Sequence, residues 1–420
     1  MNRCLVLKLP RIQSIFLTAS RLCVYLYSLV FFLRTIYVFP QRADGVLRFG
    51  IAAFGLLSFA VSEKKNWRRV HLSNYFLWFA GILVLSLISS LYSPSDNTMS
   101  FTANILDVLF IGTCFSMSVE DEKSIKRYLF FFSVCGGIIF LVLLSKNLLY
   151  IDDRLGRSLT GDNTNAFAMF LMLTLFAAIG SIYLNDNLII KIFCIVISIV
   201  DLYMLMLSGG RKYVLVPVIL IMSISVLQTS GAKNIFKRIA IISIIAFGVV
   251  IGWNYMITNP VLFNSIGRRF INRVSVDNRE LYILKGFEFF LSSPIWGHGE
   301  NSFSMLIIPY HGSQIYSHNN YIELLTNFGI IGFMWFYYFF GKTLKVNLKD
   351  AITTKDKLSI LASSLMISML VLDFGIISYS DSSLLFTFWV LCFNVAYTII
   401  PREQQERFKG ESVNPLREVN

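Results

Sequence analysis

The stretch YSHNNYIELLTNFGIIG, residues 316–332, places a histidine and two asparagines directly before an apolar run. His318, Asn319 and Asn320 stand at the threshold of the run, and Glu323 follows one turn later. The run continues far enough to be a membrane span, which needs about 20 predominantly apolar residues. We therefore read these polar residues as lying where the chain enters a membrane.

Similar apolar runs recur from one end of the chain to the other. The 420 residues are 55% hydrophobic and 15% charged, and their mean hydropathy is +0.63. A soluble domain carries about 25% charged residues, and continuous apolar runs distinguish helical spans from alternating membrane β-strands. The sequence predicts an all-α polytopic membrane protein in which residues 1–420 form a single transmembrane helical domain.

Runs near the length of a bilayer predict about 12 transmembrane helices. They are roughly residues 14–34, 45–62, 74–92, 101–118, 128–145, 165–184, 188–207, 213–228, 239–257, 321–341, 358–376 and 384–400. Arg21 and Arg34 interrupt the first run and Arg48 lies in the second, where long basic side chains can snorkel toward the interface. No clear small-residue cleavage site follows the first run, so we expect an uncleaved first helix.

The basic residues predict the orientation of these spans. Lys and Arg are about twice as frequent on the side of the N-terminus as on the other side, which predicts that both termini are cytoplasmic. The net charge of +12 is scattered through short loops, a topology signal that argues against nucleic-acid binding. Residues 258–320 form one large extracytoplasmic loop between helices 9 and 10, and its turn-rich SSPIWGHGENSF (292–303) indicates compact structure.

No metal site is expected. The six cysteines lie in or beside apolar runs without the spacing of metal ligands, and we read them as small buried residues. The neighbouring Asp152 and Asp153 could hold Mg²⁺. Basic residues are abundant on the same face, so a cation is not required, and no cofactor is predicted.

Nearly all the basic residues of the outer face fall in three loops, 146–164, 208–212 and 258–320. This placement opposes the positive-inside bias, so either lipid head groups and loop solubility or an anionic substrate must account for it. Each loop precedes a helix that begins at the outer face, and a helix N-terminus presents N–H groups and the positive end of its dipole to anions. The conjunction favours a pyrophosphate site.

The SGGRK turn (208–212) fits such a site. Gly209 and Gly210 let the backbone approach a ligand closely, and Arg211 supplies a planar fork that suits phosphate. In the run after His318, the i, i+4, i+8 spacing of Asn319, Glu323 and Asn327 places them on one helix face.

That polar stripe either packs against other helices or lines a water-filled cavity. The spacing of His318 points its side chain elsewhere. The same two alternatives apply to three aspartates in other spans, Asp107, Asp201 and Asp373.

Three motifs carry a family resemblance: the SGGRK turn, VDNRELYILKGFEFFLSSPIWGHGENSF (276–303), and the exit SHNNYIELLTNFGIIG (317–332), in which His-Asn is followed by Gly329 and Gly332. On these motifs the chain resembles the O-antigen polymerase and ligase superfamily of multi-spanning membrane glycosyltransferases. The resemblance covers roughly residues 155–340. It implies transfer of a glycan from polyprenyl diphosphate to a hydroxyl at the outer face of the bacterial cytoplasmic (inner) membrane.

The resemblance also implies the site. The essential arginines of the family correspond to Arg211 and Arg279, and its loop histidine to His318. The arginines would stabilise charge on the departing diphosphate, and His318 would take the proton of the attacking hydroxyl. We expect further substrate contacts from Arg157, Lys212, Arg273, Asn319 and Glu323. If His318 only binds, Glu323 or Glu280 would have to take the proton.

The motifs favour a polymerase of O-antigen or a related surface polysaccharide, whose acceptor is another lipid-linked repeat. The alternative is a ligase, whose acceptor is the lipid A core. A lipid-linked oligosaccharide flippase or transporter fits less well, because the polar residues gather at one face and not near the membrane midplane. The expected partners are the polyprenyl diphosphate-linked oligosaccharide, membrane lipid and a chain-length regulator protein.

Overall fold

The computed structural model describes residues 2–35, 41–62, 74–119, 121–146, 164–208, 210–229, 278–380 and 385–401, with isolated positions between 240 and 260. The elements of this part are helices. They are α1 (Asn2–Thr35), α2 (Gln41–Ser62), α4 (Asn74–Ser89), α5 (Thr98–Ser118), α6 (Glu122–Ser145), α8 (Thr164–Leu184), α9 (Leu188–Ser208), α10 (Arg211–Gln228), α14 (Arg279–Ser292), α15 (Ser302–Leu306), α16 (Ile308–His311), α17 (Asn320–Thr353), α18 (Lys357–Leu372), α19 (Leu385–Asn394) and the π-helix η4 (Val395–Ile399).

Among the described residues, 7 helices are long and apolar enough to cross a bilayer, judged by length and composition. They are found in α1, α2, α5, α6, α8, α9 and α17, and shorter apolar helices are α4, most of α10, α18, and α19 with η4. The described part of the chain is therefore all-helical, in agreement with the polytopic membrane protein that the sequence predicts. The number of 12 spans stays a prediction, and the predicted span 239–257 lies largely outside the described residues.

Several helices begin at capping side chains that the sequence supplies. The Asp121 carboxylate accepts the N–H of Ser124 at 2.8 Å at the start of α6. Asp356 does the same for Ser359 at the start of α18, also at 2.8 Å. Such caps satisfy N–H groups that a helix leaves without partners in its first turn, and they fix where each apolar run starts.

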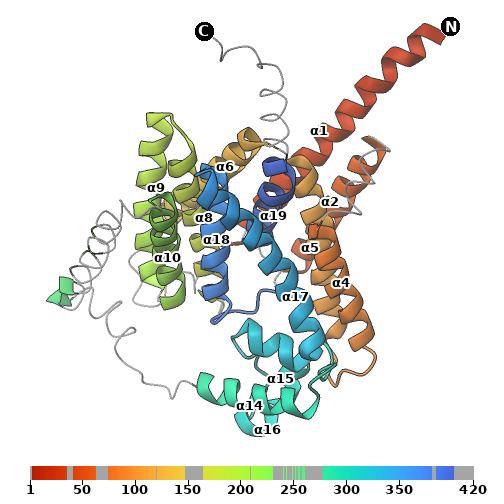
Figure 1. The fold of residues 1–420 in the computed structure, drawn as a ribbon, viewed down its shortest axis with the longest axis vertical. Helices are drawn as coiled ribbons and strands as arrows, with labels where there is room; N and C mark the ends of the chain where they lie inside the picture. Colours follow the sequence, from red (N-terminus) through yellow and green to blue (C-terminus); the bar gives the residue numbers. More distant parts are fainter. Residues whose placement is uncertain are drawn as a thin grey trace, which may run out of the picture.

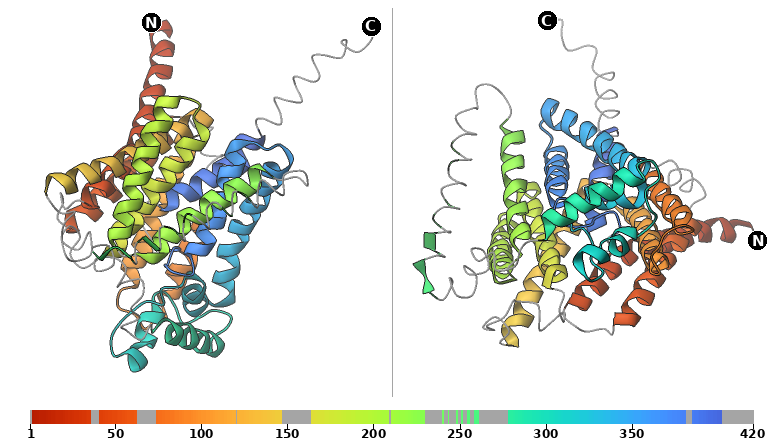
Figure 2. Two further views of the ribbon diagram at one scale, coloured as in Figure 1. Left: turned by 90° about the vertical axis from the view of Figure 1, so that its left-hand side faces the viewer. Right: turned by 90° about the horizontal axis from the view of Figure 1, so that it is seen from below.

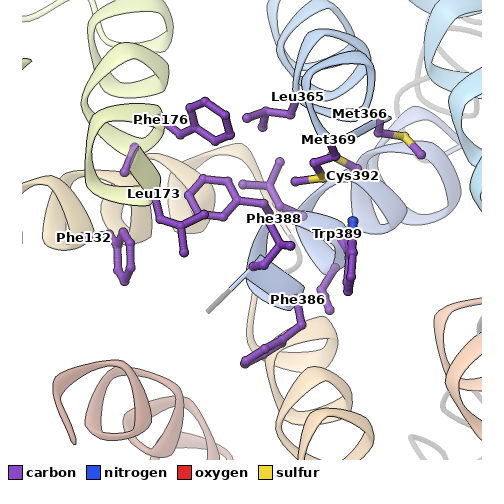
Figure 3. Packing of buried hydrophobic residues seen from close by; sticks show 14 of the residues in the cluster. Phe132, Leu173, Phe176, Leu365, Met366, Met369, Phe386, Phe388, Trp389 and Cys392 are labelled. Atoms are coloured by element: carbon purple, nitrogen blue, oxygen red, sulfur yellow. The ribbon is translucent and has the colours of Figure 1, made fainter. Parts of the chain in front are cut away.

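The centre of the bundle is α19, every residue of which is buried. In Figure 1, α18 and α19 lie between the α8, α9, α10 group and the α4, α5 pair. Figure 3 shows Phe388 of α19 among aromatic side chains from other helices. Its ring packs edge-to-face with Phe132 of α6 and Phe176 of α8, at centroid distances of 6.1 and 5.9 Å. Such contacts between rings add to the stabilisation from burial.

Arg48 does not snorkel, which corrects the reading of this residue from sequence. Its side chain is buried in the bundle and pairs with Asp107 of α5 at 3.3 Å. The Tyr27 hydroxyl of α1 donates to the same carboxylate at 2.7 Å. The reason is physical: an isolated buried charge is costly, and a partner on a neighbouring helix compensates for it.

One end of the bundle carries the short helices of the predicted large loop. Figure 1 shows α14, α15 and α16 grouped around the lower end of α17, and Figure 2 shows the same group at the same end from the side. Tyr282 of α14, Phe303 of α15 and Ile322 of α17 form a small apolar cluster there. The described part of the loop is therefore folded onto the start of α17.

Candidate functional site

The start of α17 is built by hydrogen bonds from its own sequence. The Asn319 side-chain oxygen accepts the N–H groups of Tyr321 and Ile322, at 3.0 and 3.2 Å, as the helix N-cap. The Ser317 hydroxyl donates to the Asn319 carbonyl at 2.8 Å. Asn319 thus engages the backbone with its oxygen, and it fixes the residue just before it, His318.

His318 occupies an unusual backbone conformation, with a φ of +57°. A non-glycine residue in this left-handed region is uncommon and persists where its surroundings hold it. The half-buried imidazole lies against two aromatic rings. The Tyr316 ring is 4.0 Å away between centroids, and the Tyr282 ring of α14 is stacked at 6.4 Å with an interplanar angle of 26°. The ring is therefore oriented by the loop and by α14 together.

Glu323 lies behind this turn. Its side chain is buried, and Oε2 accepts the backbone N–H of Ser317 at 2.9 Å. The predicted substrate-binding carboxylate thus bonds to the backbone immediately before His318. This bond ties the first turn of α17 to the loop before it.

The polar stripe of α17 continues into a buried network with other elements. Asn327 Oδ1 accepts the Ser302 hydroxyl and the Phe303 N–H, at 2.9 and 3.1 Å. Asn327 Nδ2 donates to the Tyr379 hydroxyl at 2.9 Å, and that hydroxyl donates to Glu300 Oε1 at 3.0 Å. The Asn327 side chain therefore packs against other elements, which is one of the two alternatives that the sequence left open for the polar stripe.

Glu300 is a carboxyl group that the sequence reasoning missed. It is fully buried beside α17, and burial, with a smaller contribution from the nearby Glu323, raises its pKa to about 7. Its motif, GHGENSF, is a sign of turns in the sequence, and the glutamate in it is given no role there. The local signal was weak because the partner, Tyr379, lies 79 residues away in the chain.

The segment after α18 wraps around the first residue of α17. Asn320 donates its backbone N–H to the Asp373 carbonyl at 2.8 Å, and its side-chain oxygen accepts the N–H groups of Ser378 and Tyr379. The Tyr337 hydroxyl donates to Asp373 Oδ2 at 2.9 Å. Asn320 is thus a structural anchor for the segment 373–379.

The same segment links the start of α17 to the start of α10. Lys212 donates from Nζ to the Gly375 carbonyl and lies over the Tyr213 ring, 4.9 Å from its centroid. Arg211 is the first residue of α10. Segment 373–379 therefore joins the starts of α17 and α10, and the first N–H groups of α17 are already bonded within the protein.

A break in α17 completes this end of the bundle. Gly329 has φ +63° and ψ −161° inside the helix, so its neighbours lose their normal intrahelical bonds. The chain at 294–299 replaces them. From α17, the Ile330 N–H donates to the Pro294 carbonyl at 2.8 Å and the Ile331 N–H to the Ile295 carbonyl at 3.4 Å. In the other direction, the N–H groups of residues 298 and 299 donate to the carbonyls of residues 326 and 327, both at 2.9 Å. Buried backbone groups are thereby satisfied.

Two glycines make this exchange possible. A Cβ on Gly297 would lie 2.5 Å from the Asn327 carbonyl, and one on Gly329 would lie 2.4 Å from the Ile295 oxygen. Both residues also have positive φ, which glycine adopts without strain. The Gly329 of the predicted Gly-x-x-Gly pattern therefore serves close backbone approach.

Some of the predicted site residues meet in the structure, and the others lie apart from them or are not described. His318, Asn319 and Glu323 meet in one turn, and Arg279 begins α14 with an exposed side chain, three residues before the Tyr282 that stacks on His318. Lys212 joins through segment 373–379, as described. Arg157 and Arg273 lie outside the described residues, and Arg211 is described only as the start of α10.

Metal ligands do not gather in this region. Across the described residues, no group of three or more His, Cys, Asp or Glu could hold a metal ion. The arrangement instead offers helix N-termini, basic residues and an oriented imidazole. Such a set can hold an anionic group and accept a proton beside it.

Comparison with known families bears on the same region. Residues 193–337 match the family described as O-antigen ligase. The matched range runs from α9 to the middle of α17 and includes the start of α10, all of α14 and the His318 turn. No match to the chain was found among curated proteins.

Proposed function

We propose, from the match of residues 193–337 to the family described as O-antigen ligase, that the chain is a member of the O-antigen polymerase and ligase superfamily and carries out a specific reaction. The protein is a glycosyltransferase that moves a glycan from polyprenyl diphosphate to a hydroxyl at the outer face of the bacterial cytoplasmic membrane. Both termini lie in the cytoplasm, and the reaction needs no metal. The carrier diphosphate already provides a good leaving group.

The observation that supports this reaction best is the strained, oriented His318 at the junction of α14 and α17. The acceptor hydroxyl oxygen attacks the anomeric carbon, the bond from that carbon to the diphosphate oxygen breaks, and the hydroxyl proton passes to the imidazole. An imidazole ordinarily titrates near pH 6.5 and suits this task at neutral pH. His318 is thus the proposed catalytic base.

The second requirement is to stabilise charge on the departing diphosphate. Arg211 at the start of α10 and Arg279 at the start of α14 are the proposed residues for this, since each begins a helix and guanidinium forks match phosphate oxygens. Lys212, Arg157 and Arg273 add positive charge nearby. Asn319 and Glu323 act by holding the His318 turn, which the hydrogen bonds described above support.

We propose a polymerase as the first candidate, because the sequence motifs favour it. A ligase is the second, because the description of the matched family names that activity. Deleting the gene and resolving surface glycan and lipid-linked species by repeat number separates them. Core with a single repeat indicates a polymerase.

The other outcomes of the deletion are equally distinct. Bare core, with long polymer retained on polyprenyl diphosphate, indicates a ligase. Bare core with no external repeat would overturn the transferase and indicate a flippase. Restoring the wild-type gene, but not its His318→Ala variant, ties the phenotype to the proposed site.

A further inference from the structure

Helix α14 presents an apolar face that no described element covers. Ile283, Phe287 and Leu291 follow an i, i+4, i+8 spacing, with Leu284 beside them, and all are exposed. Leu284 and Leu291 are 65% and 59% exposed. Spacing of this kind gathers side chains into one stripe along a helix. A four-residue stripe of bulky apolar side chains on a short helix needs a physical reason.

The other two faces of α14 have partners within the protein. Tyr282 and Gly286 are buried against α17, where the Thr326 hydroxyl donates to the Gly286 carbonyl at 3.2 Å. Lys285 and Glu288 form an ion pair at 2.7 Å on the polar side. The helix therefore has one face toward the protein, one polar side with Lys285 and Glu288, and one apolar side whose first turn also carries the exposed Glu280.

The position of α14 is at the level where the bundle ends. Its contact with Ile322 and Thr326 of α17 falls within the first two turns after Asn320. Figure 1 shows α14 lying across the lower end of the bundle, at a wide angle to α4, α9 and α10, and the view from below in Figure 2 shows it at full length. It lies flat at the edge of the apolar bundle.

Further exposed apolar side chains continue the stripe at the same level. Ile295 and Trp296 follow α14 and are 56% and 58% exposed. The Tyr92 hydroxyl, three residues beyond α4, donates to the Trp296 carbonyl at 3.1 Å. Leu91 of the α4–α5 turn and Met99 in the first turn of α5 are also exposed. Trp and Tyr concentrate where a membrane meets water.

The helices of the bundle also expose apolar surface. Only 28% of the apolar window of α9 is buried, and its exposed residues include Ile192, Val196 and Ile199. A polytopic protein covers such surface with acyl chains. A flat amphipathic helix at the end of that surface matches the geometry of helices that lie in the membrane interface.

We propose that α14 is an interfacial helix that docks on the outer surface of the phospholipid bilayer, with Ile283, Leu284, Phe287 and Leu291 among the acyl chains. Lys285 and Glu288 remain at head-group level. Docking ties the His318 turn to the membrane surface, since Tyr282 of the same helix stacks on His318. If the proposed function holds, Arg279 at its start lies where a lipid-borne diphosphate would lie.

The experiment places a polarity-sensitive fluorophore on single cysteines of the full-length protein in phospholipid nanodiscs. The background carries Cys4→Ser, because the other cysteines, Cys23, Cys114, Cys135, Cys194 and Cys392, are buried. The test variants are Ile283→Cys and Phe287→Cys on the apolar side, and Glu288→Cys, which is neither three nor four residues from them, is the matched control. Each label is quenched in turn by aqueous iodide and by nitroxide-labelled phospholipid.

We expect blue-shifted emission and quenching by the lipid-borne nitroxide at positions 283 and 287, with iodide effective only at 288. Efficient iodide quenching at both test positions would overturn the proposal. Protection from both quenchers, with energy transfer between labelled copies, would also overturn it and indicate a protein contact on this face. The readout needs no enzymatic activity, so it stands or fails independently of the proposed transferase.

Discussion

The carboxylate of Glu323 and the backbone N–H of Ser317 are joined by a 2.9 Å hydrogen bond across the start of α17. A residue inside the helix thereby holds the turn that precedes it. His318 sits between these two residues in the chain, and it keeps a φ of +57°. The relationship separates two roles for Glu323, holding the turn and taking a proton, and the two make different predictions.

Glu323→Gln should retain most transferase activity, because the amide oxygen can still accept the Ser317 N–H. Glu323→Ala should lose activity and stability, since an unsatisfied buried N–H costs about 1–3 kcal/mol. Polymer length on a glycan gel and the melting midpoint in detergent measure both effects. If Glu323→Gln is as inactive as a variant lacking His318, the carboxylate takes part in proton transfer.

Replacing His318 tests the proposed base directly. His318→Asn should keep the fold, because asparagine tolerates the left-handed conformation, and should lower turnover by about 10²–10⁴-fold, the usual contribution of a general base. His318→Ala should abolish polymer at an unchanged protein level. Normal chain length in either variant, at equal expression, would remove His318 from the chemistry.

The backbone exchange around Gly329 predicts a steep cost for a single methyl group. Gly329→Ala puts a Cβ 2.4 Å from the Ile295 oxygen in a backbone region whose strain alone costs about 1–3 kcal/mol. Gly341→Ala in the same helix is the matched control, since a Cβ there meets nothing within 4 Å, and it should be neutral or stabilising by about 0.5–1 kcal/mol. Equal melting midpoints for the two variants would contradict the exchange.

The burial of Glu300 predicts how stability depends on pH. Its pKa rises from 4.5 to about 7, so the folded state binds the proton more tightly. The associated stabilisation is complete below about pH 4.5 and is lost as pH rises through 7, a change of about 3 kcal/mol for this group. The side chain in Glu300→Gln stays neutral, so the stability of this variant relative to the parent protein should increase as pH rises.

Melting midpoints of the parent and Glu300→Gln at pH 5 and pH 8 check this sign. The glutamine oxygen can still accept a hydrogen bond from the Tyr379 hydroxyl, so both proteins keep this bond. If the melting midpoint of Glu300→Gln minus that of the parent does not increase from pH 5 to pH 8, Glu300 is not the group responsible.

The buried Arg48–Asp107 pair predicts strong non-additivity. Arg48→Met alone leaves the Asp107 charge in the bundle and should destabilise by about 3–5 kcal/mol. Asp107→Leu alone should cost a similar amount. The double variant removes both charges and should recover much of the loss. Additive losses in a double-mutant cycle would indicate that the pair contributes little.

Hydropathy predicts some helices closely, because bilayer thickness sets the length of a span, whereas α17 (Asn320–Thr353) continues well beyond the predicted 321–341. The predicted span 188–207 is α9 within one residue, and 165–184 is α8 within one residue. The shared face of Asn319, Glu323 and Asn327 also follows from spacing alone. Local periodicity carries this information without any knowledge of tertiary contacts.

Partners distant in sequence could not be predicted in this way. Asp107 lies 59 residues from Arg48, and no local pattern joins them. The break at Gly329 was equally hidden, because a glycine in an apolar run is common in membrane helices. Glu300 carried no signal of burial, since its environment is made by Asn327 and Tyr379 from other elements.

The exchange between Gly297 and Gly329 also fixes an order of events during biosynthesis. The backbone groups that α17 leaves open cannot be satisfied by lipid; only the chain at 294–299 supplies their partners. That chain is translated earlier than α17, so under the proposed orientation it has to reach the outer side by the time the helix inserts. A delay in exporting the loop would leave the new helix with unpaired backbone groups around Gly329. A protein in that state would be a target for quality-control proteases.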